Sequence, residues 1–290
     1  MSYIERIQNS IEYIHCNYSN VITLDDLAEK AFCSKYHYLR VFHALIGQSP
    51  VEYLRMYRLN KAAFLLSTTE ITFIEIALEC GFNSPIVFSR LFKDAFGVTP
   101  SSFKKNNIPL PIFKEIQLGN DKAFVESKNI LLGPRFIDKK GFMVVGMQCK
   151  TTVESNLQNH VVEKLWQKFC PRINQIPYRI QYGESFGVNY FDSSINRYVY
   201  TACVEVGKVE NIPKGMVSKV IPECKYAVFT IMEEQHKLLK NFYYSIDYIF
   251  GKWLPSSGFE LCSEVDMLEF YDNRFCRSPY SQMDLFIPIC

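Results

Sequence analysis

The sequence lacks the features that mark a membrane-spanning, secreted or disordered protein. No stretch approaches about 18 consecutive apolar residues, so we expect no membrane span. The first ten residues, MSYIERIQNS, do not contain the apolar core of a signal peptide. Hydrophobic residues make up 48% and charged residues 21%, the balance of a globular protein. The net charge is only +2, so any basic surface must be local.

Paired cysteines are also missing. The chain has ten cysteines, but they lie singly, with no CxxC pair and no Cys/His pair at metal-ligand spacing. Isolated cysteines at apolar positions, such as Cys80 and Cys203, are typical of small core residues in a reducing cytoplasm. A redox-sensing role for one of them is the alternative. We expect a cytoplasmic protein with no metal site and no cofactor.

What the sequence does contain is one pattern written twice, offset by 50 residues. Residues 34–50 are SKYHYLRVFHALIGQSP and residues 84–100 are SPIVFSRLFKDAFGVTP. The residues shared in step are Ser34/Ser84, Arg40/Arg90, Phe42/Phe92, Gly47/Gly97 and Pro50/Pro100. A short helix, a tight turn and a second capped helix form the helix-turn-helix unit, whose second helix enters the DNA major groove. Two such units predict a DNA-binding protein.

Each copy has helix signals at both ends. Ser34 and Ser84 stand where an N-cap is needed, and Gly47 and Gly97 where a left-handed residue ends a helix. The apolar stripes expected to be buried are Tyr38, Val41, Phe42 and Leu45, then Phe88, Leu91, Phe92 and Ala95. The opposite stripes hold Lys35, Tyr36, Leu39, Arg40 and His43, then Pro85, Ile86, Ser89, Arg90 and Lys93. One such helix could be any exposed amphipathic helix, but the duplication in register argues against that interpretation.

These residues carry a family resemblance over residues 3–105. IEIALECGFNSPIVFSRLFKDAFGVTPSSFKK and SPVEYLRMYRLNKAAFLL resemble the DNA-binding domain of AraC/XylS-type transcription regulators. The resemblance implies two helix-turn-helix units joined by a long helix, with both recognition helices on one side of the duplex. It implies contacts to base edges from Tyr36, Leu39, Arg40, Ser84, Pro85, Ile86, Ser89 and Arg90, and we add Lys35 and Lys93 as further DNA contacts. Because Leu39, Pro85 and Ile86 offer few hydrogen-bonding groups, direct readout depends on Arg40, with methyl contacts and DNA shape contributing more.

The chain changes character after KKNNIPLPIFKEI, whose prolines forbid a continuing helix. We predict a DNA-binding domain at 1–107, a linker at 108–125 and a second domain at 126–290. The second domain has strand-like runs and two helical stretches, about 157–169 and 236–253. The strand-like runs are GFMVVGMQCK, SFGVNYF, YVYTACVEVG, KYAVFTIME, MLEFYD and MDLFIPI. Their order predicts an α+β fold with a duplicated βαββ unit.

This second half resembles the GyrI-like effector-binding domain, and the order of the two domains resembles that of Rob-type regulators. The resemblance implies a cleft that accepts hydrophobic, often cationic, small molecules, with Glu269 as its acid. A carboxylate among aromatic rings can hold a cation through charge and ring faces. The aromatic candidates are Trp166, Tyr190, Tyr198, Tyr200, Trp253 and Tyr271. The alternative is that Glu269 is a solvated strand residue and the aromatics are core.

The sequence therefore predicts a transcription regulator controlled by a small apolar ligand. Its expected partners are double-stranded DNA, the effector and RNA polymerase, with no membrane. Two alternatives remain open. Glu269 and Tyr271 could form the catalytic pair of a GyrI-like hydrolase, although nothing else suggests a catalytic set and we expect no enzyme. The second domain could also be ligand-independent, contacting polymerase or protecting the chain.

Overall fold

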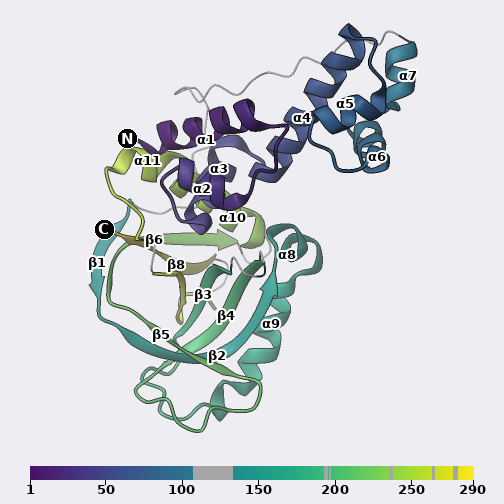
Figure 1. Ribbon diagram of the computed structural model, residues 1–290. Coiled ribbons are helices and arrows are strands. Elements are labelled where there is room, and N and C mark those ends of the chain that lie inside the picture. The colour runs from purple at the N-terminus through teal and green to yellow at the C-terminus, as the bar shows by residue number, and fades with distance from the viewer. Residues whose placement is uncertain (107–132, 193–194, 196, 235–237, 263–264, 277–279) are drawn as a thin grey trace. The chain divides into compact units, whose positions relative to one another are not determined.

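A computed structural model describes residues 1–106, 133–192, 195, 197–234, 238–262, 265–276 and 280–290 (Figure 1). The chain separates into two compact units, Met1–Ala123 and Phe124–Cys290. The predicted linker, 108–125, lies outside the described residues, so the domain boundaries remain predictions. No helix in the described part of the chain is long and apolar enough to cross a membrane.

The first unit is all helical over residues 1–106, which confirms the predicted class. Its helices are α1 (Tyr3–Asn17), α2 (Leu24–Lys30), α3 (Lys35–Ile46), α4 (Pro50–Thr68), α5 (Phe73–Glu79), α6 (Pro85–Phe96) and α7 (Pro100–Lys105). Most are short, so tertiary packing and end caps, more than intrinsic propensity, must hold them. The α2–α3 and α5–α6 pairs are the two helix-turn-helix units.

The predicted caps of α3 and α6 are confirmed. The Ser34 hydroxyl accepts a hydrogen bond from the His37 amide at 3.4 Å, and the Ser84 hydroxyl accepts one from the Val87 amide at 3.4 Å. Gly47 and Gly97 end the two helices with φ of 84° and 77°, in the left-handed region that favours glycine. These local signals fix where each recognition helix begins and ends.

Helix α4 joins two hydrophobic cores. Tyr53 and Tyr57, in its first half, are buried together with residues of α1 and α3. Its second half packs Leu59, Ala62, Ala63 and Leu66 against α5, α6 and α7. A 19-residue helix is about 28 Å long, so α4 can separate the two helix-turn-helix units by roughly that length.

One predicted core position in α6 is wrong. Ala95 is exposed, whereas Phe88 and Phe92 are fully buried as predicted. Phe96 takes the place expected of Ala95, since its ring lies 4.6 Å from that of Phe92 and packs against the same core. The larger aromatic side chain reaches the core from the neighbouring position.

The second unit is built on one eight-stranded sheet in which every pairing is antiparallel. Its strands are β1 (Arg135–Lys139), β2 (Phe142–Thr151), β3 (Ser185–Asp192), β4 (Arg197–Val206), β5 (Val217–Ile221), β6 (Cys224–Glu234), β7 (Met267–Tyr271) and β8 (Tyr280–Ile289). Its helices are α8 (Val153–Asn159), α9 (Val161–Phe169), η1 (Cys170–Gln175), α10 (Leu238–Tyr248), η2 (Ile249–Trp253) and α11 (Leu254–Ser257).

The predicted α+β class and all six predicted strands are confirmed, with two additions. Strands β1 and β5 precede the two βαββ units and were not predicted. The helix expected at 157–169 is divided into α8 and α9 at His160, which has a φ of 52°. The expected start of the other helix, at 236, lies outside the described residues, and its last turns, η2, have π geometry.

The two halves of the sheet exchange their first strands. The strand order is β1-β6-β8-β7-β3-β4-β2-β5, so β1 of the first half extends the second half and β5 of the second half extends the first. Arg135 on β1 forms an ion pair of 2.7 Å with the buried Asp284 on β8, where Thr230 and Arg274 also donate to the carboxylate. Burial raises the pKa of Asp284, but these hydrogen bonds outweigh it and hold the pKa below its usual range.

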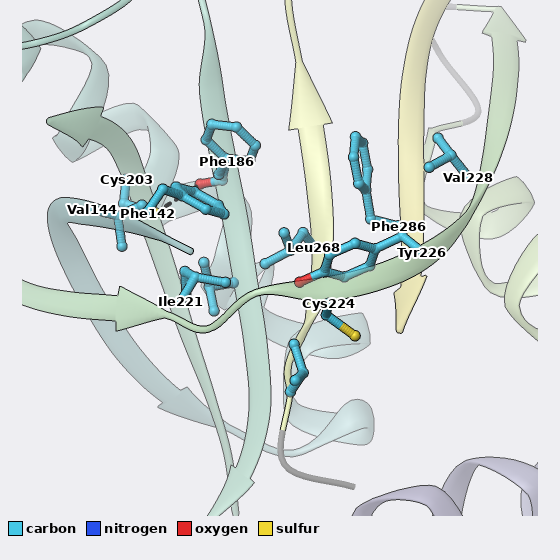
Figure 2. Packing of buried hydrophobic residues seen from close by; sticks show 12 residues of the cluster. Phe142, Val144, Phe186, Cys203, Ile221, Cys224, Tyr226, Val228, Leu268 and Phe286 are labelled. Atoms are coloured by element: carbon cyan, nitrogen blue, oxygen red, sulfur yellow. Dashed lines mark hydrogen bonds between the residues drawn. The ribbon is translucent and has the colours of Figure 1, made fainter. Parts of the chain in front are cut away.

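The sheet has apolar side chains on both faces. Figure 2 shows the cluster on one face, where Phe142, Phe186 and Leu268 lie near Tyr226 and Phe286. On the other face, α9 packs against β2 and β4, with Tyr200 and Trp166 in that cluster. The two cysteines named as core residues, Cys80 and Cys203, are fully buried, and burial raises the pKa of the Cys80 thiol to about 12. Four other cysteines are exposed, namely Cys16, Cys170, Cys276 and Cys290.

Candidate DNA interface and ligand site

Helix α3 presents the first set of predicted DNA contacts. Lys35, Tyr36, Leu39 and Arg40 are all half-buried on it. The Arg40 guanidinium lies 4.6 Å from the ring centre of Tyr36, one turn earlier, and this contact orients the arginine. Lys35 forms a 2.5 Å ion pair with Asp25 of α2, so part of its charge is already used within the protein.

Helix α6 presents the second set. Ser84 is its N-cap and Pro85 its first residue, while Ser89 is half-buried and Arg90 and Lys93 are exposed. Ile86 has 82% of its surface exposed, which is unusual for an isoleucine and suits contact with a thymine methyl group. The next residue, Val87, is 41% exposed and was not predicted, because it lies on neither stripe.

In the second unit, a buried carboxylate lies among aromatic side chains. Glu269 on β7 is only 4% exposed, whereas a carboxylate on a strand face is usually solvated. The Tyr271 hydroxyl donates to Glu269 Oε2 at 2.7 Å, and the Tyr200 hydroxyl donates to the same oxygen. Trp166 Nε1 donates to the Tyr200 oxygen at 3.0 Å, and the Trp166 and Tyr271 rings lie edge to face at 5.1 Å.

The phenol of Tyr200 acts as a hydrogen-bond donor in this cluster. Burial raises its pKa well above the usual value, and the charge of Glu269 raises it further. Tyr200 therefore keeps its proton at neutral pH and stabilises the carboxylate through it. Three elements distant in the sequence, α9, β4 and β7, supply the four side chains of this cluster, which are Trp166, Tyr200, Glu269 and Tyr271.

A glycine that sequence reasoning missed makes room for the cluster. Gly187 on β3 lies directly opposite Glu269 on β7 and is two residues from Asn189. A Cβ at position 187 would lie 2.6 Å from Glu269 Oε2 and would also overlap the Tyr200 hydroxyl. The available signal was a glycine inside the strand SFGVNYF, because an interior strand glycine often marks a close approach.

Two predicted aromatic residues lie elsewhere. Tyr190 points to the other face of β3, where Lys219 Nζ lies 3.9 Å from its ring centre and also pairs with Asp266 at 2.5 Å. Trp253 packs edge to face on Phe229 at 4.9 Å. Tyr198 is half-buried on β4, two residues from Tyr200. The structure therefore joins Trp166, Tyr200 and Tyr271 with Glu269, but not Tyr190 or Trp253.

Within the described ranges, no group of three or more histidine, cysteine, aspartate or glutamate side chains could hold a metal ion. The ten cysteines are all free thiols. What the geometry offers is hydrogen bonding, charge and aromatic surface.

A helical unit with two capped helix-turn-helix motifs, followed by a sheet unit with a buried carboxylate, defines a DNA-binding regulator with an effector-binding domain. Comparison with known families agrees. A model described as a helix-turn-helix domain matches residues 27–106. A model described as integron-associated effector binding protein (Cass2) matches residues 135–289, more than half of the chain.

The relatives specify the family. The regulatory protein SoxS of Salmonella typhimurium is 36% identical over 104 residues, which cover 36% of this chain and 97% of SoxS. The transcriptional regulator BrlR of Pseudomonas aeruginosa is 31% identical over 157 residues, 53% of this chain and 54% of BrlR. An integron cassette protein of Vibrio cholerae matches 55% of this chain and 96% of its own, with 16% identity and a TM-score of 0.40. The chain belongs to the AraC family of transcriptional regulators and carries a Cass2/GyrI-like effector-binding domain.

Proposed function

We propose that this regulator contacts its operator through α3 and α6 and responds to an apolar cation bound at Glu269. The domains proposed are those expected from the sequence, with residues 1–107 binding DNA and residues 126–290 binding the effector. RNA polymerase is the proposed protein partner, and the cytoplasm, where the DNA lies, is the proposed location.

One observation carries the ligand proposal, namely the burial of the Glu269 carboxylate among Trp166, Tyr200 and Tyr271. Burying a carboxylate is costly unless hydrogen bonds or opposite charge compensate. The hydrogen bonds from the two phenols offset part of the desolvation penalty of the carboxylate. The charge of a bound cation would offset more of it, while the apolar part of the ligand packs on the aromatic rings. Aromatic ring faces attract cations as well. The cluster therefore suits a ligand that is both cationic and apolar.

The test compares a cation with a neutral molecule of similar shape. Suitable probes are (4-biphenylyl)methyltrimethylammonium and 4-biphenylmethanol, titrated into the full chain by calorimetry. Glu269→Gln keeps most of the shape and hydrogen bonding but removes the charge. We expect the cation to bind about tenfold to a hundredfold more weakly to this variant, and the neutral probe to bind almost equally.

Glu210→Gln is the matched control, because Glu210 is an exposed carboxylate of the same unit that pairs with Lys208. It should leave the affinity for both probes unchanged. Equal changes for the two probes in Glu269→Gln, or no change for either, would mean that Glu269 does not hold a cation.

We also propose that the second unit binds without catalysis. The relatives are named as regulators, and Glu269 Oε2 accepts hydrogen bonds from two phenols, as expected of a fixed acceptor rather than of a base awaiting a substrate proton. Incubating the protein with ester analogues of the probes and following their hydrolysis tests this. Turnover lost in Glu269→Gln would overturn the proposal.

A further inference from the structure

Asn189 carries a buried acceptor beside the Glu269 cluster. It lies on β3 directly opposite Tyr200 on β4 and Met267 on β7. Because side chains alternate along a strand, Asn189 faces the same side as Gly187, over which the Glu269 carboxylate and the Tyr200 hydroxyl lie. Its position is diagonal to that of Glu269, a spacing of about 7–8 Å that long side chains or a small ligand can bridge.

The side-chain oxygen of Asn189 has no hydrogen-bond partner among the described residues and is shielded from solvent. A buried acceptor left without a partner costs about 1–3 kcal/mol, so such atoms are rare and call for an explanation. The neighbouring Tyr200 hydroxyl cannot satisfy it, because its single proton is donated to Glu269.

The other two hydrogen-bond donors of the cluster also already have acceptors within it. The Tyr271 hydroxyl donates to Glu269, and the Trp166 indole N–H donates to Tyr200. Each of these three side chains has one N–H or O–H proton to donate. The groups that the cluster leaves for a ligand are therefore hydrogen-bond acceptors, namely the carboxylate and the Asn189 oxygen. Its own three donors already bond to acceptors within the cluster.

We propose that Asn189 selects, among apolar cations, those that carry N–H groups on the charged centre. Protonated amines, amidines and guanidines can place positive charge beside Glu269 while an N–H bonds the Asn189 oxygen. A quaternary ammonium or a phosphonium ion has the charge but no donor, so it leaves that oxygen unsatisfied. Sites built to hydrogen-bond an N–H discriminate strongly against analogues that lack it. This inference rests on the proposed function of Glu269.

The experiment uses the full chain and a matched pair of cations, (4-biphenylyl)methylammonium and its N,N,N-trimethyl analogue, titrated by calorimetry. We expect the wild-type protein to prefer the primary ammonium by about tenfold, the worth of one hydrogen bond to a charged donor. Asn189→Leu has similar volume and no acceptor, and should abolish the preference by weakening only the primary ammonium. Asn189→Asp retains an acceptor and should keep the preference or increase it.

The possible outcomes separate the two proposals. If both cations bind in a manner that depends on Glu269, but Asn189→Leu leaves their ratio unchanged, the role of Asn189 is wrong and that of Glu269 stands. A preference for the trimethyl cation in the wild-type protein would also overturn the role of Asn189. If neither cation binds, or Glu269→Gln changes nothing, the proposed function fails and this inference fails with it. Unchanged binding of the trimethyl probe shows that the leucine variant is folded.

Discussion

Gly187 and Glu269 lie directly opposite each other where β3 meets β7, the two strands at the centre of the sheet. The missing side chain of the glycine leaves the space that the carboxylate and the Tyr200 hydroxyl fill. The cluster therefore sits at the junction of the two halves, and its geometry depends on both. Gly187, which has no side chain, thus determines where the buried Glu269 carboxylate can lie.

Replacing that glycine should displace the cluster. In Gly187→Ala, the new methyl group would lie 2.6 Å from Glu269 Oε2, so the carboxylate and the Tyr200 phenol must move. Overpacking of this kind costs about 1–3 kcal/mol. We expect a lower free energy of unfolding of the second unit and weaker binding of apolar cations, measured by urea titration and calorimetry.

The fluorescence of Trp166 and Trp253 reports on this unit alone, because the chain has no other tryptophan. Gly207→Ala is the control, since a Cβ there would meet its nearest neighbours at 3.8 Å, an ordinary contact. If both alanine variants behaved alike, the cluster would not need the space at Gly187.

We expect Arg40 and Lys93 to make different kinds of contact with DNA, the first with a base and the second with a phosphate. Arg40, held by Tyr36, can pair with a guanine edge, so Arg40→Ala should cost about 1–3 kcal/mol in specific binding and relax the preference at one base position. Exposed Lys93 suits a phosphate contact, so Lys93→Ala should weaken all sequences alike and reduce the dependence of affinity on salt. Binding selections at two salt concentrations measure both effects. Equal loss of specificity in the two variants would contradict the assignment.

The first unit should lose stability in mild acid because of His37. Burial, and secondarily Arg40, lower the pKa of His37 from 6.5 to about 3. Below pH 6.5 the unfolded chain therefore binds a proton that the folded chain does not, so stability is present above this pH and falls by up to about 1.4 kcal/mol per pH unit towards pH 3.

Urea titrations followed by helical circular dichroism, between pH 7 and pH 5, measure this slope. His37→Gln should flatten it, whatever that substitution does to stability at pH 7. The control is His43→Gln, which removes an exposed histidine from the same helix and should flatten the slope less than His37→Gln does. An identical slope in wild type and His37→Gln would exclude His37 as the cause.

Residues 1–107 alone should bind the same operator as the full chain. This stretch contains both capped recognition helices and the two cores joined by α4. Two recognition helices about one turn apart should protect roughly 20 base pairs, two turns of duplex. Footprinting of the fragment and the full chain tests this. A folded fragment that binds only nonspecifically would show that the second unit contributes to recognition.

The features predicted best from the sequence were those that depend only on residues close together in the chain. Serine caps, terminal glycines and apolar stripes act locally, and they placed α3 and α6 correctly. The short strands β1 and β5 were missed because five residues carry little periodic signal and their stability comes from distant partners. Likewise, the sequence could not show which aromatic residues surround Glu269. Tyr190 and Tyr200 look alike in a strand, and the register of β3 on β4 decides which face each one takes.

The exchange of β1 and β5 makes the two halves of the second unit depend on each other. Cutting the chain between β4 and β5 would give two fragments, each with an unpaired outer strand and an exposed edge. Each half therefore leaves its first strand without a partner unless the other half is present. A single repeat placed alone would leave its first strand available to a second copy, and two copies could then make the reciprocal exchange that the whole chain makes within itself.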